Sequence, residues 1–197
     1  MELTDKDFVD KSRRVQIKYY ELLDKIDSLS ADSLIRKIEK LMDEDPDFFD
    51  TYLMIYEIYQ DNGELKKANQ ILNDAYVRAI NLITDKKGNW PDSLMWGFLE
   101  NRHIIRTIFN KAVHLWDEGQ NDEALELFRK LLKTNPNDNV GARNYILAIR
   151  MGMSFEEYEE QFNKGGYYDS ESVTWFDKNA PKFPDEFGWW FKSQEEL

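Results

Sequence analysis

Two stretches of the chain carry the same internal spacing of small and apolar residues. In each, a small residue stands five positions after a glycine, and further residues follow at steps of four and three. The stretches contain Gly63, Ala68, Leu72 and Ala75, and then Gly119, Ala124, Phe128, Leu131 and a closing Pro136. This spacing predicts a helix, a tight turn and a second helix whose small residue allows close packing. Because such a pair cannot bury its apolar face alone, we expect an all-α protein in which helix pairs stack on one another.

Helical periodicity and helix-end signals divide most of the chain into further helices. Thr4 with Asp7 predicts a capped start, and Asp45-Pro46 predicts a stop, since a proline disfavours helix in the residue before it. Pro91 suits the first position of a new helix, Asp138 suits a cap, and Ser154 with Glu157 forms a capping box. The predicted helices are about 7–25, 30–45, 48–59, 64–84, 101–118, 122–133, 139–151 and 154–165.

The C-terminal part is unusually aromatic. Nine aromatic residues lie in it: Tyr167, Tyr168, Trp175, Phe176, Phe183, Phe187, Trp189, Trp190 and Phe191. Disordered tails are poor in aromatic residues, so we expect residues 167–197 to dock as a cap over the last helix pair. The alternative is an aromatic strap that fills a groove of its own chain or of a neighbouring copy.

Composition limits the classes of partner. The net charge of -12 argues against nucleic acid, because phosphate binding needs clustered Lys and Arg. The chain has no cysteine, which excludes disulfides and thiolate ligands. It begins with an acidic stretch and has no apolar run long enough for a membrane span. We therefore expect a cytoplasmic protein that does not bind membranes.

The sequence offers no catalytic motif. Its two histidines, His103 and His114, lie eleven positions apart on one predicted helix, about 16 Å along the axis, too far apart to share a metal ion. Phosphate-binding glycine loops and the nucleophile motif Gly-x-Ser-x-Gly are absent. We expect a protein that is not an enzyme and that uses no cofactor and no metal.

The two matched units resemble tetratricopeptide repeats. The marks are the turn glycine, the alanine, the large residue and the closing proline, which the second unit carries at Gly119, Ala124, Phe128 and Pro136. The first unit departs from them at its end, with Ile80 in place of the proline. The segments Trp96–Arg102 and Asn135–Arg143 are also similar to a pattern in a set of bacterial tetratricopeptide proteins of uncharacterised role.

The resemblance implies a right-handed α-α superhelix of about three to four helix pairs. The repeats would span about 5–46, 49–82, 105–138 and 139–165, with an insert at 83–104, so that residues 1–166 form the repeat domain. In this family the first helix of each repeat lines a concave surface that binds peptides. Members that bind chaperone tails use a lysine and asparagine clamp, where this chain has Leu53 with Glu57 and Phe109 with Val113. We therefore do not expect it to bind chaperone tails.

The predicted groove is basic and apolar over its second half. Residues at spacings of three and four on the two later first helices share one face: Arg102, Arg106, Phe109, Val113, Trp116, Arg143, Leu147 and Arg150. Arginine forks bind carboxylates in bidentate fashion, which favours a peptide with an acidic or C-terminal carboxylate group. The alternative is internal pairing, in which Glu100 or Asp138 occupies Arg102 and Arg143.

Three functions fit these features. The first is a non-catalytic scaffold that binds a peptide segment of another protein. The second is a structural homodimer that associates through the aromatic C-terminal part. The third is an acidic decoy or immunity-type inhibitor of a basic partner.

Overall fold

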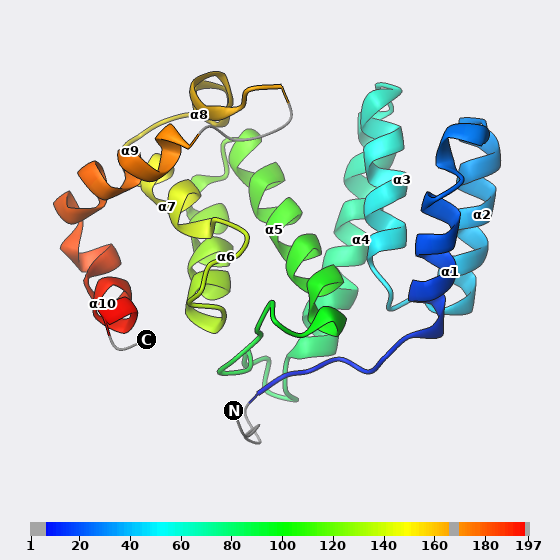
Figure 1. Cartoon of the computed structure of the whole chain (residues 1–197), viewed down its shortest axis with the longest axis horizontal. Helices are drawn as coiled ribbons and strands as arrows, with labels where there is room; N and C mark the ends of the chain where they lie inside the picture. Colours follow the sequence, from blue (N-terminus) through cyan, green and yellow to red (C-terminus); the bar gives the residue numbers. More distant parts are fainter. Residues whose placement is uncertain (1–6, 166–169, 196–197) are drawn as a thin grey trace. The chain divides into compact units, whose positions relative to one another are not determined.

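A computed structural model describes residues 7–165 and 170–195 of the chain, and these residues are mainly helical (Figure 1). They form no β-strand, and an isolated parallel bridge joins Asp7 to Ser93. The chain divides into two compact units, Met1–Lys111 and Ala112–Leu197. The all-α expectation is confirmed.

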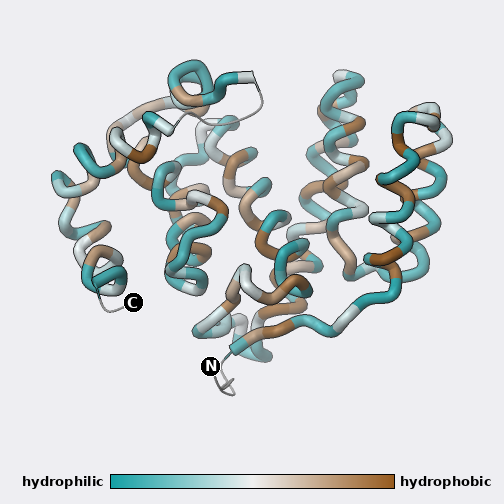
Figure 2. Tube along the Cα trace, viewed as in Figure 1, coloured by the Kyte–Doolittle hydropathy of each residue, from teal (hydrophilic) through white to brown (hydrophobic). Residues whose placement is uncertain are grey.

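Ten α-helices lie in the described part of the chain. They are α1 (Arg14–Leu23), α2 (Ala31–Glu44), α3 (Asp50–Asp61), α4 (Leu65–Ile83), α5 (Arg102–Asp117), α6 (Asn121–Thr134), α7 (Ala142–Arg150), α8 (Phe155–Phe162), α9 (Glu171–Asn179) and α10 (Pro184–Glu195). Apolar and polar residues alternate along the helices (Figure 2), so each element has a face that it must bury. The boundary between the units falls within α5.

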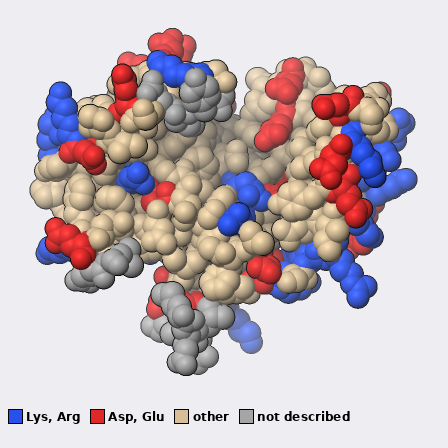
Figure 3. Space-filling view, in the orientation of Figure 1, with Lys and Arg blue, Asp and Glu red and all other residues tan. Residues whose placement is uncertain are grey.

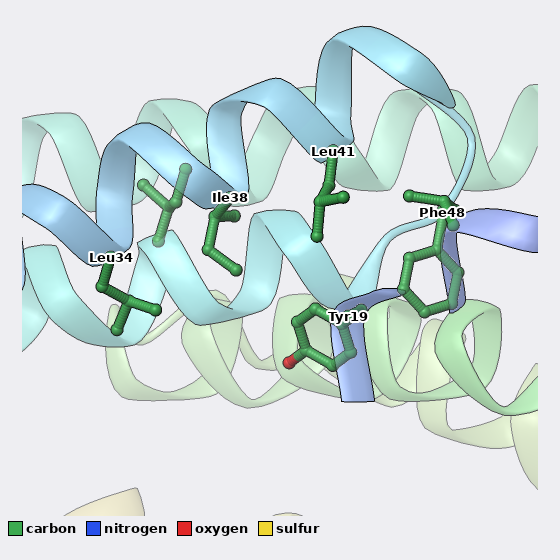
Figure 4. Close-up of a cluster of buried hydrophobic side chains, with 7 residues drawn as sticks. Tyr19, Leu34, Ile38, Leu41 and Phe48 are labelled. Carbon is green, nitrogen blue, oxygen red and sulfur yellow. The ribbon is translucent and has the colours of Figure 1, made fainter. Parts of the chain in front are cut away.

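The first unit packs α1 on α2, α2 on α3 and α3 on α4. Its core joins one face of each of the first three helices with Phe48, which lies in the turn between α2 and α3. Leu34, Ile38 and Leu41 of α2 face Tyr19 and Phe48 (Figure 4). The Tyr19 and Phe48 rings meet edge to face with centroids 5.5 Å apart, an arrangement that aromatic pairs prefer.

Both repeated glycines end a helix in the way their spacing predicts. Gly63 has φ of 72° and Gly119 has φ of 75°, a left-handed conformation that glycine adopts without steric cost. The small residues Ala68 and Ala124, five positions later, are completely buried. The two helices on either side of the Gly63 turn, α3 and α4, are therefore held close together.

The second unit packs α6 on α7 and α7 on α9. Phe128 of α6 stacks on Tyr145 of α7, with ring centroids 5.2 Å apart. Tyr145 contacts Tyr158 of α8, which in turn contacts Trp175 of α9. Aromatic rings therefore form much of the core of this unit.

The predicted start of the first helix is wrong. Asp7 belongs to an extended segment, α1 begins only at Arg14, and Thr4 lies outside the described residues. The side chain of Asn101 donates to the carbonyl of Phe8 and accepts from the amide of Asp10. Tertiary hydrogen bonds thus replace the backbone bonds that a helix would supply at 7–13.

The predicted helix at Pro91 is also wrong, because residues 84–98 are irregular. Asp85 accepts hydrogen bonds from the backbone amides of Lys87 and Asn89 and from the Asn89 side chain. Such local bonds compete with helix formation. A short 3₁₀ turn, Leu99–Asn101, then leads into α5.

The predicted capping box is confirmed, and the predicted cap at Asp138 is shifted. Ser30 caps α2, and Ser154 with Glu157 forms a complete capping box at α8. Asp138 does cap α7, but it accepts from the amides of Ala142 and Arg143, so the helix starts at Ala142 instead of Asn139. Asp138 and Gly141 both have positive φ, which delays the start of the helix.

Candidate interaction sites

In the first unit, the predicted arginines already have partners within the chain. Arg106 of α5 makes a two-pronged ion pair with Asp50 of α3, and its Nε lies 2.9 Å from Asp50 Oδ1. Arg102 donates to the carbonyl of Trp96 at 3.1 Å. Both guanidinium groups also lie over the Trp96 ring, at 5.0 and 5.7 Å from its centroid. Asp50 and Trp96 therefore hold these two arginines in place.

The two predicted arginines of the second unit are paired as well. Arg143 Nη1 binds Asp138 Oδ2 at 2.8 Å, which is the internal pairing that we considered as the alternative. Arg150 binds Asp185 and Glu186 of α10 at 2.8 and 2.6 Å. Carboxylates of the same chain thus occupy both guanidinium groups.

The predicted apolar groove residues differ in burial. Trp116 is only 2% exposed, and its Nε1 donates to the carbonyl of Met153. Leu147 is completely buried, whereas Phe109 and Val113 are half-buried. Trp116 and Leu147 are therefore core residues of the second unit. Phe109 and Val113 keep part of their surface in contact with solvent.

A pocket lies between α1, α3 and α5 of the first unit, and we call it the α1–α3–α5 pocket. Its volume is about 210 Å³, and it is lined by Tyr19, Tyr20, Leu23, Asp50, Leu53, Met54, Glu57 and Arg106. Ligand sites for small molecules are typically about 300–1,000 Å³. A pocket of this size fits one inserted side chain better than it fits a metabolite.

The polar rim of this pocket carries an excess negative charge. Asp50 and Arg106 neutralise each other, but Glu57 is exposed and has no ion-pair partner among the described residues. Partial desolvation of the carboxylate by the surrounding protein, together with repulsion from Asp61 and Asp50, raises the pKa of Glu57. A cation placed beside Glu57 would relieve this repulsion.

A buried polar network in the first unit was not foreseen from the sequence. Arg13 binds both carboxylate oxygens of Asp10, at 2.6 and 3.1 Å, and also Asp45 at 2.5 Å. The Phe49 amide donates to Nδ1 of His103, which leaves the ring proton on Nε2 to donate to Asp10 at 3.1 Å. We call Asp10, Arg13, Asp45, Asn101 and His103 the N-terminal network.

The N-terminal network has a structural role. Burial opposes ionisation of Asp10, but hydrogen bonds from His103 and Arg13 outweigh it and hold the pKa of Asp10 below its ordinary value. The side chains of Asp10 and His103 are 4% and 2% exposed, so a substrate cannot reach this pair. The network ties residues 8–13 to the starts of α3 and α5 instead.

Three further features bear on the kinds of ligand and surroundings that residues 7–165 and 170–195 can accommodate: metal ligands, surface charge and helix hydrophobicity. No group of three or more His, Cys, Asp or Glu in these ranges is placed to hold a metal ion. Over α1 to α3, acidic and basic side chains are interspersed on the face seen in Figure 3. None of the described helices is long and apolar enough to cross a bilayer.

Comparison of the chain with models of known protein families, with curated proteins and with solved structures finds no match. The candidate sites are therefore interpreted from their own geometry.

Proposed function

We propose that this chain is a non-catalytic protein-interaction module of tetratricopeptide type that binds a peptide segment of another protein. The α1–α3–α5 pocket carries this proposal. It is open to solvent at Tyr20, which is 45% exposed, and its floor is apolar at Leu23, Leu53 and Met54. One anchor side chain in such a pocket supplies much of the binding energy of a peptide.

The charges at the pocket favour a basic anchor. A carboxylate of a partner would have to displace Asp50 from Arg106, whereas a lysine or arginine would meet the unpaired Glu57. The aliphatic stem of such a side chain would pack on Leu53 and Met54 while its charged head stayed at the rim. The pairing of Arg106 thus weighs against the acidic partner that the sequence suggests.

Selection from a random peptide library tests this function. Peptides selected on the unmodified protein should be enriched in Lys or Arg beside an apolar residue, and Glu57→Lys should weaken their binding at least about tenfold. Glu39→Lys is the matched control, because Glu39 is exposed on α2 and does not line the pocket. Equal binding to both variants, or an acidic consensus among the peptides, would contradict the proposal.

A further inference from the structure

The C-terminal segment, residues 170–195, is held on the second unit mainly through its α10 carboxylates and its aromatic rings. Arg129 of α6 binds both carboxylate oxygens of Glu186 of α10 through its Nε and Nη2, with Nε at 2.8 Å from Oε1. Arg150 of α7 reaches the same carboxylate and also Asp185. Two arginines from two helices therefore form ion pairs with two adjacent acidic residues of α10.

Aromatic contacts complete this attachment. The guanidinium of Arg143 lies 5.3 Å from both the Phe176 and Trp190 rings, so it is held by α9 and α10 together. Trp190 Nε1 donates to the carbonyl of Pro136 at 2.9 Å. We call Arg129, Arg143 and Arg150 the arginine surface.

The segment also has a core of its own. Phe176 of α9 packs on Phe187, Trp190 and Phe191 of α10, with ring centroids 5.2 to 6.2 Å apart. Phe176 and Phe187 are 2% and 0% exposed. Because these contacts lie within the segment, α9 and α10 can move as one body.

The contact between α10 and the arginine surface has the character of an interface between two proteins. Arginine and tryptophan, which are enriched in the energetic centres of such interfaces, make its main contacts. A surface pocket of about 270 Å³ opens where α10 meets α6 and α7, lined in part by Leu132, Ile146 and Trp189. Beside this arginine contact, the segment packs through Trp175 of α9 on Tyr158 and Phe162 of α8.

We infer that the C-terminal segment exchanges between two copies of this chain, each copy docking its α9 and α10 on the arginine surface of the other. Reciprocal exchange preserves the ion pairs and ring contacts, so the dimer differs from the monomer mainly in the entropy of association. The tether gives the monomer an effective concentration in the mM range. The dimer therefore forms at high protein concentration or where the contact within one chain is blocked.

Charge reversal on the two sides of the contact tests this inference. One variant carries Asp185→Arg and Glu186→Arg, and the other carries Arg129→Glu and Arg150→Glu. Within each variant, like charges face each other and docking in the same chain is lost. In a 1:1 mixture, opposite charges meet only between chains, so sedimentation should show a species of twice the 23.5 kDa chain mass.

A chain with all four substitutions is the control, because it restores opposite charges within one molecule and should sediment as a monomer. Association of the mixture should be at least about 10²-fold tighter than association of the unmodified chain, which retains the competing contact. A mixture that stays monomeric while the fourfold variant is folded would overturn the inference.

A second experiment tests exchange in the unmodified chain and needs no substitution. Nitrogen-15-labelled and unlabelled chains, mixed at about 1 mM, should give dimers of mixed mass in native mass spectrometry. Monomers alone at that concentration would also overturn the inference.

Discussion

The two ends of the described chain are both fastened by arginine–carboxylate pairs, but the arginines of the two ends differ in burial. At the N-terminal network, the side chains of Arg13 and Asp10 are 2% and 4% exposed. At the C-terminal segment, the side chains of Arg129 and Arg150 are 40% and 25% exposed. A buried charge that loses its partner cannot be solvated, whereas a half-exposed one can. Similar chemistry therefore predicts that the C-terminal attachment opens more readily than the N-terminal one.

The largest effect is expected at the N-terminal network. Asp10→Ala would leave Arg13 and His103 without their shared carboxylate in a buried site. We expect a loss of about 3–5 kcal/mol in the free energy of unfolding of the first unit, measured by urea denaturation. Asp43→Ala, at an exposed position of α2, should change it by less than about 0.5 kcal/mol. Similar losses in the two variants would contradict a special contribution of the buried N-terminal network to stability.

A smaller effect is expected at α10. Glu186→Ala removes the carboxylate shared by Arg129 and Arg150, but water can reach both guanidinium groups. We expect a loss of about 1–3 kcal/mol in the second unit, with earlier melting of α10 followed by tryptophan fluorescence. Glu195→Ala, on the same helix and exposed, is the control. A loss as large as that of Asp10→Ala would argue that the C-terminal segment is not separable.

Acid should affect the two units differently. Burial raises the pKa of Asp138 to about 6, against the hydrogen bonds from Arg143 and Ala142. The ordinary pKa of an aspartate is 3.8. As pH falls from about 6 toward that value, Asp138 binds a proton in the folded second unit but not in the unfolded chain, so the stability of this unit rises. The pKa of Asp10 is lowered, so its contribution to the first unit is lost only as pH falls below about 4.

Carbon-13 NMR of the carboxyl groups measures this difference. The titration step near pH 6 should disappear in Asp138→Asn, and with it the rise in melting temperature between pH 7 and 5. A second unit whose stability is unchanged or falls over that range in the unmodified chain would contradict the expected sign.

The smallest effect is expected at a surface pair. Lys18 binds Glu44 at 2.5 Å, but their side chains are 52% and 44% exposed. We expect Glu44→Gln to cost at most about 0.5 kcal/mol, measured by the same urea denaturation. A cost near that of Asp10→Ala would show that burial does not set the strength of these pairs.

Local signals in the sequence were sufficient for most helices. The glycine turns, the Ser30 cap and the Ser154 capping box depend only on neighbouring residues, so they could be predicted. The extended segment at 7–13 could not, because Asn101 and His103 hold it from about 90 positions away. The partners of Arg106 and Arg150 were equally hidden, since Asp50 and Glu186 lie on other helices. Tyr167 and Tyr168 lie outside the described residues.

The expected groove shows the same limit. Helical spacing placed Trp116 and Leu147 on one face with the arginines, but it carries no information on what covers that face. The structure buries both side chains in the second unit. The α1–α3–α5 pocket required the relative positions of three helices, which no local pattern encodes.

Hydrogen exchange of the unmodified chain tests the contrast between the two ends most directly. The comparison is made within each unit: α10 against α7, and residues 8–13 against the part of α5 that they contact. We predict that α10 exchanges at least about tenfold faster than α7, while residues 8–13 exchange together with α5. Equal protection of α10 and α7, or early exchange of residues 8–13, would contradict the account.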